Sequence, residues 1–77
     1  MSELRPAFSD LLRQWRKSRN LSQWALSDTA GGSQRHLSFL ESGRSAPSRG
    51  MVLRLAESLA VPLREQNALL AAAGFAP

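Results

Sequence analysis

A pair of glycines at residues 31–32 separates two short helical segments, and this spacing limits the possible folds more than any other feature of the chain. Before the pair, Ser22 is suited to cap a helix over residues 23–29, because its hydroxyl can accept a bond from a free backbone N–H. After the pair, Ser33 is suited to cap a second helix over residues 34–42. The sequence therefore predicts two short helices that meet at a tight turn.

Three further segments show the one-sided apolar spacing of amphipathic helices. The first is predicted from about Ala7 to about Arg19, and its apolar positions are Phe8, Leu11, Leu12 and Trp15. We expect Trp15 to lie in the core. The next follows Ser48, a further cap, and its apolar positions are Val52, Leu55, Ala56 and Leu59. In the last, Pro62 fits the first turn, and the apolar positions are Leu63, Leu69, Leu70 and Ala73.

No segment alternates polar and apolar residues in the way that a half-buried strand does. The prediction is an all-α fold of five helices, arranged as a single domain over residues 1–77. The chain has no apolar run of about 18 residues and no signal pattern in its opening residues. We therefore expect a cytoplasmic protein with no membrane partner.

The basic residues are concentrated in the first part of the chain. Residues 1–50 hold eight basic and four acidic side chains, a net charge of +4, whereas residues 51–77 hold two of each. A basic surface suits a polyanionic partner, although one that only keeps the protein soluble explains the charge equally well. Within this half, we expect Arg13, Lys17 and Arg19 to form a solvated basic face.

The chain offers little for catalysis or for metal binding. It has no cysteine, which excludes disulfides and cysteine-based zinc sites, and its one histidine excludes a histidine-rich metal site. That histidine, His36, is expected to be solvated. The carboxylates are dispersed along the chain, and no phosphate-binding glycine loop is present. We expect neither an enzyme nor a bound cofactor or metal.

The helix predicted over residues 34–42 has two distinct sides when successive residues are placed 100° apart. Its inward side carries Leu37, Leu40 and Glu41. Its outward side and edges present amide, guanidinium, hydroxyl and aromatic groups: Gln34, Arg35, Ser38, Phe39 and Ser42. Such groups can recognise guanine, adenine and the thymine methyl, and the major groove accepts one α-helix. The pattern predicts a helix-turn-helix whose second helix enters the major groove of double-stranded DNA.

At these residues the chain resembles the lambda-repressor-like, xenobiotic-response-element family of bacterial and phage transcriptional regulators. The resemblance covers roughly Phe8 to Leu63. It rests on several strings taken together: Leu-Ser-Gln at 21–23, Ala-Gly-x-Ser at 30–33, Leu37 to Glu41 with Gly43, Pro47-Ser48, and Leu12-Arg13-x-Trp15-Arg16. Residues 33–49 and the ending from Asn67 resemble one subgroup, in which a larger ligand-binding region often follows such a domain. A regulator of this kind is expected to bind DNA as a homodimer.

The resemblance also implies roles for individual residues. Base contacts are expected from Gln34 and Arg35 in the first turn of the second helix, with Ser33, Ser38 and Phe39 as further candidates. Phosphate contacts are expected from Gln23, Ser42, Arg44, Ser48 and Arg49. Arg16 and Glu41 match a pair that the family joins in a partly buried salt bridge.

Two positions depart from the family pattern, and two questions stay open. Ser27 stands where the family usually has alanine, and Gly32 stands where it has a branched apolar residue, which we expect to loosen the turn. Trp24 is expected either to form an interdomain or dimer contact or to be simply buried at the surface. The apolar face of the last helix either forms a dimer contact or belongs entirely to the core. The alternative function is a protein-interaction module, such as an antitoxin that binds a toxin, with Trp24 and the apolar tail as its contact surfaces.

Overall fold

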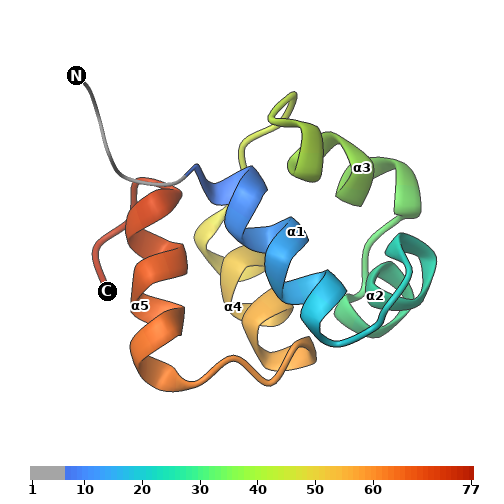
Figure 1. Ribbon diagram of the computed structural model, residues 1–77. Coiled ribbons are helices and arrows are strands. Elements are labelled where there is room, and N and C mark those ends of the chain that lie inside the picture. Colours follow the sequence, from blue (N-terminus) through green and yellow to red (C-terminus); the bar gives the residue numbers. More distant parts are fainter. Residues whose placement is uncertain (1–6) are drawn as a thin grey trace.

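The computed structural model describes residues 7–77, which form five α-helices and no strand (Figure 1). The helices are α1 (Phe8–Ser18), α2 (Gln23–Ala30), α3 (Gln34–Ser42), α4 (Arg49–Ser58) and α5 (Leu63–Ala72). Helix α1 packs against α3 and α5, helix α2 packs against α3 and α4, and α4 also packs against α5. The predicted all-α fold is confirmed. The prediction placed the end of α2 one residue too early, because Ala30 is still helical.

The starts of three helices are confirmed by hydrogen bonds within single turns. The hydroxyl of Ser22 accepts from the N–H of Ala25 at 3.0 Å, and that of Ser33 accepts from the N–H of His36 at the same distance. Ser48 caps α4 in the same way. Each bond satisfies a donor that has no partner inside the helix. These caps fix where α2, α3 and α4 begin.

The core lies where the apolar sides of the helices meet. Its largest fully buried side chains are Leu12, Leu26, Leu40, Val52, Leu55, Leu59 and Leu69. Trp15 packs against this core but is only partly buried, so it lies at the core's edge. In α5, Leu69 and Leu70 are buried, and Ala73, which follows the helix, packs against the core, so this face is part of the monomer's core.

Near the ends of helices, one sequence-based expectation is wrong and another is incomplete. Leu63 was expected on the apolar face of α5, but it is the first residue of that helix and no neighbour covers it, leaving it 73% exposed. Arg19 is exposed, as expected, but its guanidinium also donates to the carbonyls of Leu59 at 2.7 Å and Ala60 at 3.1 Å, which the sequence did not indicate. It also lies 5.2 Å from the ring centroid of Trp15. Arg19 therefore joins α1 to the end of α4, where the carbonyls lack helical partners.

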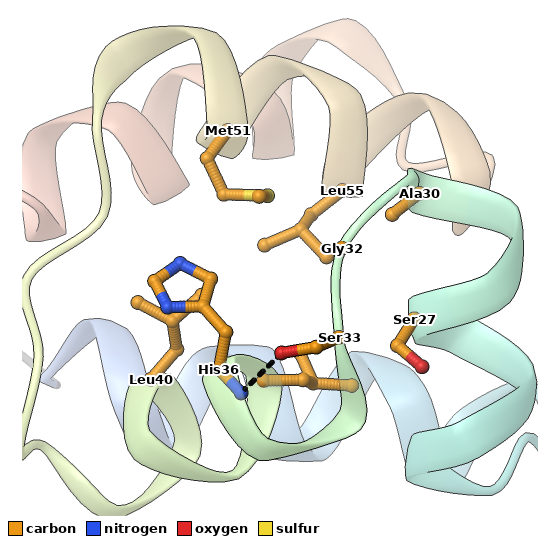
Figure 2. Close-up of a pocket in the computed structure, with 9 residues that line it drawn as sticks. Ser27, Ala30, Gly32, Ser33, His36, Leu40, Met51 and Leu55 are labelled. Atoms are coloured by element: carbon orange, nitrogen blue, oxygen red, sulfur yellow. Dashed lines mark hydrogen bonds between the residues drawn. The ribbon is translucent and has the colours of Figure 1, made fainter.

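The turn between α2 and α3 accommodates both departures from the family pattern. Ser27 is buried, and its hydroxyl donates to the carbonyl of Trp24 at 2.8 Å, so its polar group is satisfied. Gly31 adopts the left-handed conformation (φ +84°), which ends α2, and Gly32 does not. Gly32 lines a cavity of about 10 Å³, together with residues that include His36 and Met51 (Figure 2). This space is about one water molecule in size, so the missing side chain leaves only a small void.

Replacing Gly32 with alanine is expected to raise the free energy of unfolding by about 0.4–1 kcal/mol, because alanine restricts the unfolded chain. The new Cβ would lie 3.6 Å from Cε of Met51, an ordinary van der Waals distance. Gly31→Ala is the matched control. It is expected to lower the same free energy by about 1–2 kcal/mol, because an alanine would be strained in the left-handed conformation. Urea unfolding followed by circular dichroism measures both changes, and two shifts of the same sign would contradict this account of the turn.

Candidate nucleic-acid interface

Helix α3 presents one exposed side and one buried side. At its start, Ser33, Gln34 and Arg35 are exposed, whereas Ser38 and Phe39 are partly buried. The opposite side is formed by Leu37, Leu40 and Glu41, which are at most 3% exposed. The helix lies on the opposite side of the molecule from α5 (Figure 1). The two sides are those expected from the 100° spacing.

Glu41 anchors the inward side of α3 to the two helices that it faces. Its carboxylate accepts from Arg16 twice, from Nε at 2.6 Å and from Nη2 at 3.0 Å. It also accepts from the side-chain amide of Gln23 at 3.1 Å. The remaining Arg16 contact is a bond from Nη1 to the carbonyl of Leu21 at 2.9 Å. The ion pair implied by the family resemblance is therefore present, and it connects α1, the start of α2 and α3.

A second arginine holds the end of α3, and sequence reasoning missed it. Arg13 was expected to be solvated, but its Nη1 donates to the backbone carbonyl of Glu41 at 2.7 Å. The same guanidinium pairs with Asp10 on the surface of α1. No local spacing relates residues 13 and 41, so only the packing of α1 on α3 reveals this contact. Lys17, the remaining member of the expected basic face, is exposed.

Two cations lie beside one aromatic ring on the exposed side of α3. The guanidinium carbon of Arg35 is 5.6 Å from the centroid of the Phe39 ring, and that of Arg44 is 5.3 Å from it. Both arginines are exposed, and neither forms a salt bridge with another described residue. Their charges are therefore directed to solvent rather than neutralised within the fold.

The residues expected to contact phosphate differ in how their polar groups are already hydrogen-bonded within the fold. Gln23 is engaged with Glu41, and the hydroxyl of Ser42 donates to the carbonyl of Phe39 at 3.2 Å. Ser48 is exposed and caps α4. Arg49 donates to the carbonyl of Ala76 at 2.6 Å, which ties it to the end of the described chain. The structure thus gathers Gln34, Arg35, Phe39 and Arg44 around α3, and it places Ser48 and Arg49 at the start of α4.

His36 differs from its expected position in solvent. It is partly buried, and Figure 2 shows its ring facing the same small cavity as Met51. This position follows from its place on the edge of α3, between the exposed and the buried side. In residues 7–77, no group of three or more histidine and carboxylate side chains is placed to hold a metal ion.

Taken together, these features can contact a polyanion and base edges at the same time. One guanidinium and one amide are exposed on α3, a second guanidinium follows the end of this helix, and the other side of the helix is held by a buried ion pair. Guanidinium and amide groups are those that recognise guanine and adenine in the major groove. A compact helical protein with such an exposed helix after a glycine turn is a DNA-binding protein of the helix-turn-helix class.

The comparison with known families agrees with this class. The family model described as Helix-turn-helix matches residues 12–66, so the chain belongs to this lambda-repressor-like family, which binds DNA and is not enzymatic. No curated protein and no solved structure matches the chain. Within residues 7–77, every helix is too short or too polar to cross a bilayer.

Proposed function

We propose that the chain acts as a transcriptional regulator that binds double-stranded DNA in a sequence-specific manner, with α3 in the major groove. One observation carries this proposal: Gln34 and Arg35 are exposed on the first turn of α3, while Glu41 on its other side is held by Arg16 and Gln23. A rigid helix positions its polar groups with less loss of entropy on binding.

The proposal includes binding as a symmetric homodimer, each copy reading one half-site. The first turn of α3 supplies the base contacts, from Gln34 and Arg35, with Ser33, Ser38 and Phe39 as further candidates. Arg44 is the proposed phosphate contact on the same surface, and Gln23, Ser42, Ser48 and Arg49 are further ones. Of these, Arg49 would have to leave the carbonyl of Ala76.

Selection of bound sequences from a random pool of DNA duplexes tests this proposal directly. We expect an inverted repeat whose half-sites are centred about 34 Å apart, one turn of the double helix. A single unrepeated site would contradict the homodimer, and recovery of no preferred sequence would contradict specific recognition.

Binding to the selected duplex is expected to weaken steeply with salt. If a dimer neutralises about six phosphates, the logarithm of affinity falls against the logarithm of salt concentration with a slope of about −5. Arg44→Ala is expected to make this slope shallower by about 2, one phosphate contact for each copy. Fluorescence anisotropy between 50 and 200 mM salt, concentrations over which such effects are large, measures it, and an unchanged slope would exclude Arg44 from phosphate binding.

A second candidate function is a protein-interaction module, such as an antitoxin that binds a toxin. One observation favours it: Trp24 is 64% exposed at the start of α2, which is unusual for so large an aromatic side chain. A gel shift with genomic fragments beside a pull-down of partner proteins separates the two functions. A stable protein complex together with no DNA retention would favour the second.

A further inference from the structure

The ring of Phe39 can do more than contact DNA itself, because the side chains of Arg35 and Arg44 lie next to it. Arg35 precedes Phe39 by one helical turn, so the two side chains are neighbours on α3. The ring is partly buried, so its position is held by the fold, whereas both arginines that approach it are exposed. An exposed arginine with no such neighbour would sample many conformations.

Arg44 reaches the same ring because of the way in which α3 ends. Gly43 is left-handed (φ +80°), and this conformation turns the chain back over the last turn of the helix. The N–H of Arg44 then donates to the carbonyl of Phe39 at 2.9 Å, and the N–H of Gly43 approaches the carbonyl of Leu40 at 3.4 Å. This pair of bonds is the Schellman arrangement, in which the residue after the left-handed one contacts the residue five positions earlier. Here that contact is a guanidinium beside an aromatic ring.

A guanidinium beside a ring keeps its hydrogen-bond donors free. The attraction is to the face of the ring, so the N–H groups at the edge of the guanidinium plane remain able to bind a base or a phosphate. Neither Arg35 nor Arg44 donates a side-chain hydrogen bond to another described residue, in contrast to Arg13, Arg16, Arg19 and Arg49. The ring therefore orders these two cations without occupying the groups that recognition needs.

We propose that Phe39 is a positioning residue that holds Arg35 and Arg44 together on the exposed side of α3 for contact with a DNA base and a backbone phosphate. This inference rests on the proposed function, because it assigns the two cations to DNA. It differs from a direct role of the ring against a thymine methyl. The contact would order both arginines before binding, which lowers the entropy lost in the complex.

Two variants of the 77-residue chain separate ring chemistry from side-chain bulk. Phe39→Leu keeps an apolar side chain and removes the aromatic face, whereas Phe39→Tyr keeps that face. Against the selected duplex, Phe39→Leu is expected to bind about five- to thirty-fold more weakly, from the loss of two cation–aromatic contacts. Phe39→Tyr is expected to bind nearly as tightly as the wild type. Circular dichroism confirms that both variants remain helical.

Two further measurements distinguish positioning from direct contact. In an Arg35→Ala/Arg44→Ala background, Phe39→Leu should cause almost no additional loss, because the groups that it positions are gone. Replacing the thymines of the duplex with uracils removes the methyl groups, and the ratio of wild-type to Phe39→Leu affinity should stay the same. A full loss in the double-arginine background, or a ratio near one with uracil, would overturn the proposal.

NMR of the free protein tests the positioning without any DNA. Protons next to the guanidinium groups of Arg35 and Arg44 should be shifted by the aromatic ring in the wild type and in Phe39→Tyr, and these shifts should be lost in Phe39→Leu. Unchanged arginine signals in Phe39→Leu would overturn the positioning role alone. Unchanged DNA affinity in the Arg35→Ala/Arg44→Ala variant would instead contradict the proposed function.

Discussion

Replacing Glu41 with alanine is expected to lower the free energy of unfolding by about 3–5 kcal/mol, the usual effect of removing one member of a buried ion pair. The carboxylate is the acceptor for both Arg16 and Gln23, and its side chain is 3% exposed. Without it, the Arg16 guanidinium, at 13% side-chain exposure, would keep its charge with only the carbonyl of Leu21 as an acceptor. Such a loss is a large share of the stability of a domain of this size.

Chemical unfolding followed by tryptophan fluorescence measures this effect, and the chain provides a matched control. Asp10→Ala also removes a carboxylate from an arginine, but that pair is about half exposed on the surface of α1. Its loss is expected to cost no more than about 1 kcal/mol. An Arg16→Met/Glu41→Leu variant should be more stable than Glu41→Ala, because it leaves no unpaired charge. Equal losses in Glu41→Ala and Asp10→Ala would show that the buried pair has no special role.

Replacing Arg35 with alanine is expected to weaken binding to the selected duplex by about 1–3 kcal/mol, or about 5- to 150-fold. The proposed cause is the loss of the two hydrogen bonds with which an arginine recognises a guanine. The preference at one base pair of the half-site should then relax, because no other group replaces that contact. The free energy of unfolding should change little, since the side chain is exposed and in no salt bridge with a described residue.

The matched control for Arg35→Ala is Arg64→Ala. Arg64 is exposed and belongs to α5, a helix that lies on the opposite side of the molecule from α3 (Figure 1). Its removal changes the net charge equally and is expected to leave the preferred sequence unchanged. Anisotropy with the selected duplex and with a scrambled duplex measures both variants. If Arg35→Ala weakens binding to the two duplexes equally, Arg35 contacts the DNA backbone and does not recognise a base.

The helix boundaries around the turn could be predicted because they depend on contacts within a few residues. Ser22 and Ser33 each bond a backbone N–H three positions later, and Gly31 and Gly43 are left-handed at the ends of α2 and α3. The exposed and buried sides of α3 follow from its 3.6-residue period in the same way. The family resemblance also led to the Arg16–Glu41 pair.

The features that the sequence did not predict have a different physical origin. Arg19 lies 40 positions from Leu59, and Arg13 lies 28 positions from Glu41, yet each arginine donates to the carbonyl of that distant residue. A long basic side chain in solvent and one that reaches a neighbouring helix have the same local sequence pattern. Leu63 shows the reverse case, because it has the spacing of a core residue but lies at the end of α5, where nothing covers it. Burial depends on the neighbours that packing brings, which spacing along one helix does not contain.

By itself, the sequence determined where α2, α3 and α4 begin, where the chain turns between them, and which side of α3 is polar. Tertiary structure alone decided which hydrogen bonds hold the opposite side of α3. Arg13 bonds the backbone carbonyl of Glu41, and Arg16 and Gln23 bond its carboxylate. Tertiary structure also decided which basic residues remain free. The physical reason is the range of the contacts. Caps and helical periods act over three to five residues, whereas the charges that remain free beside α3 depend on which arginines are bonded to groups far away in the sequence.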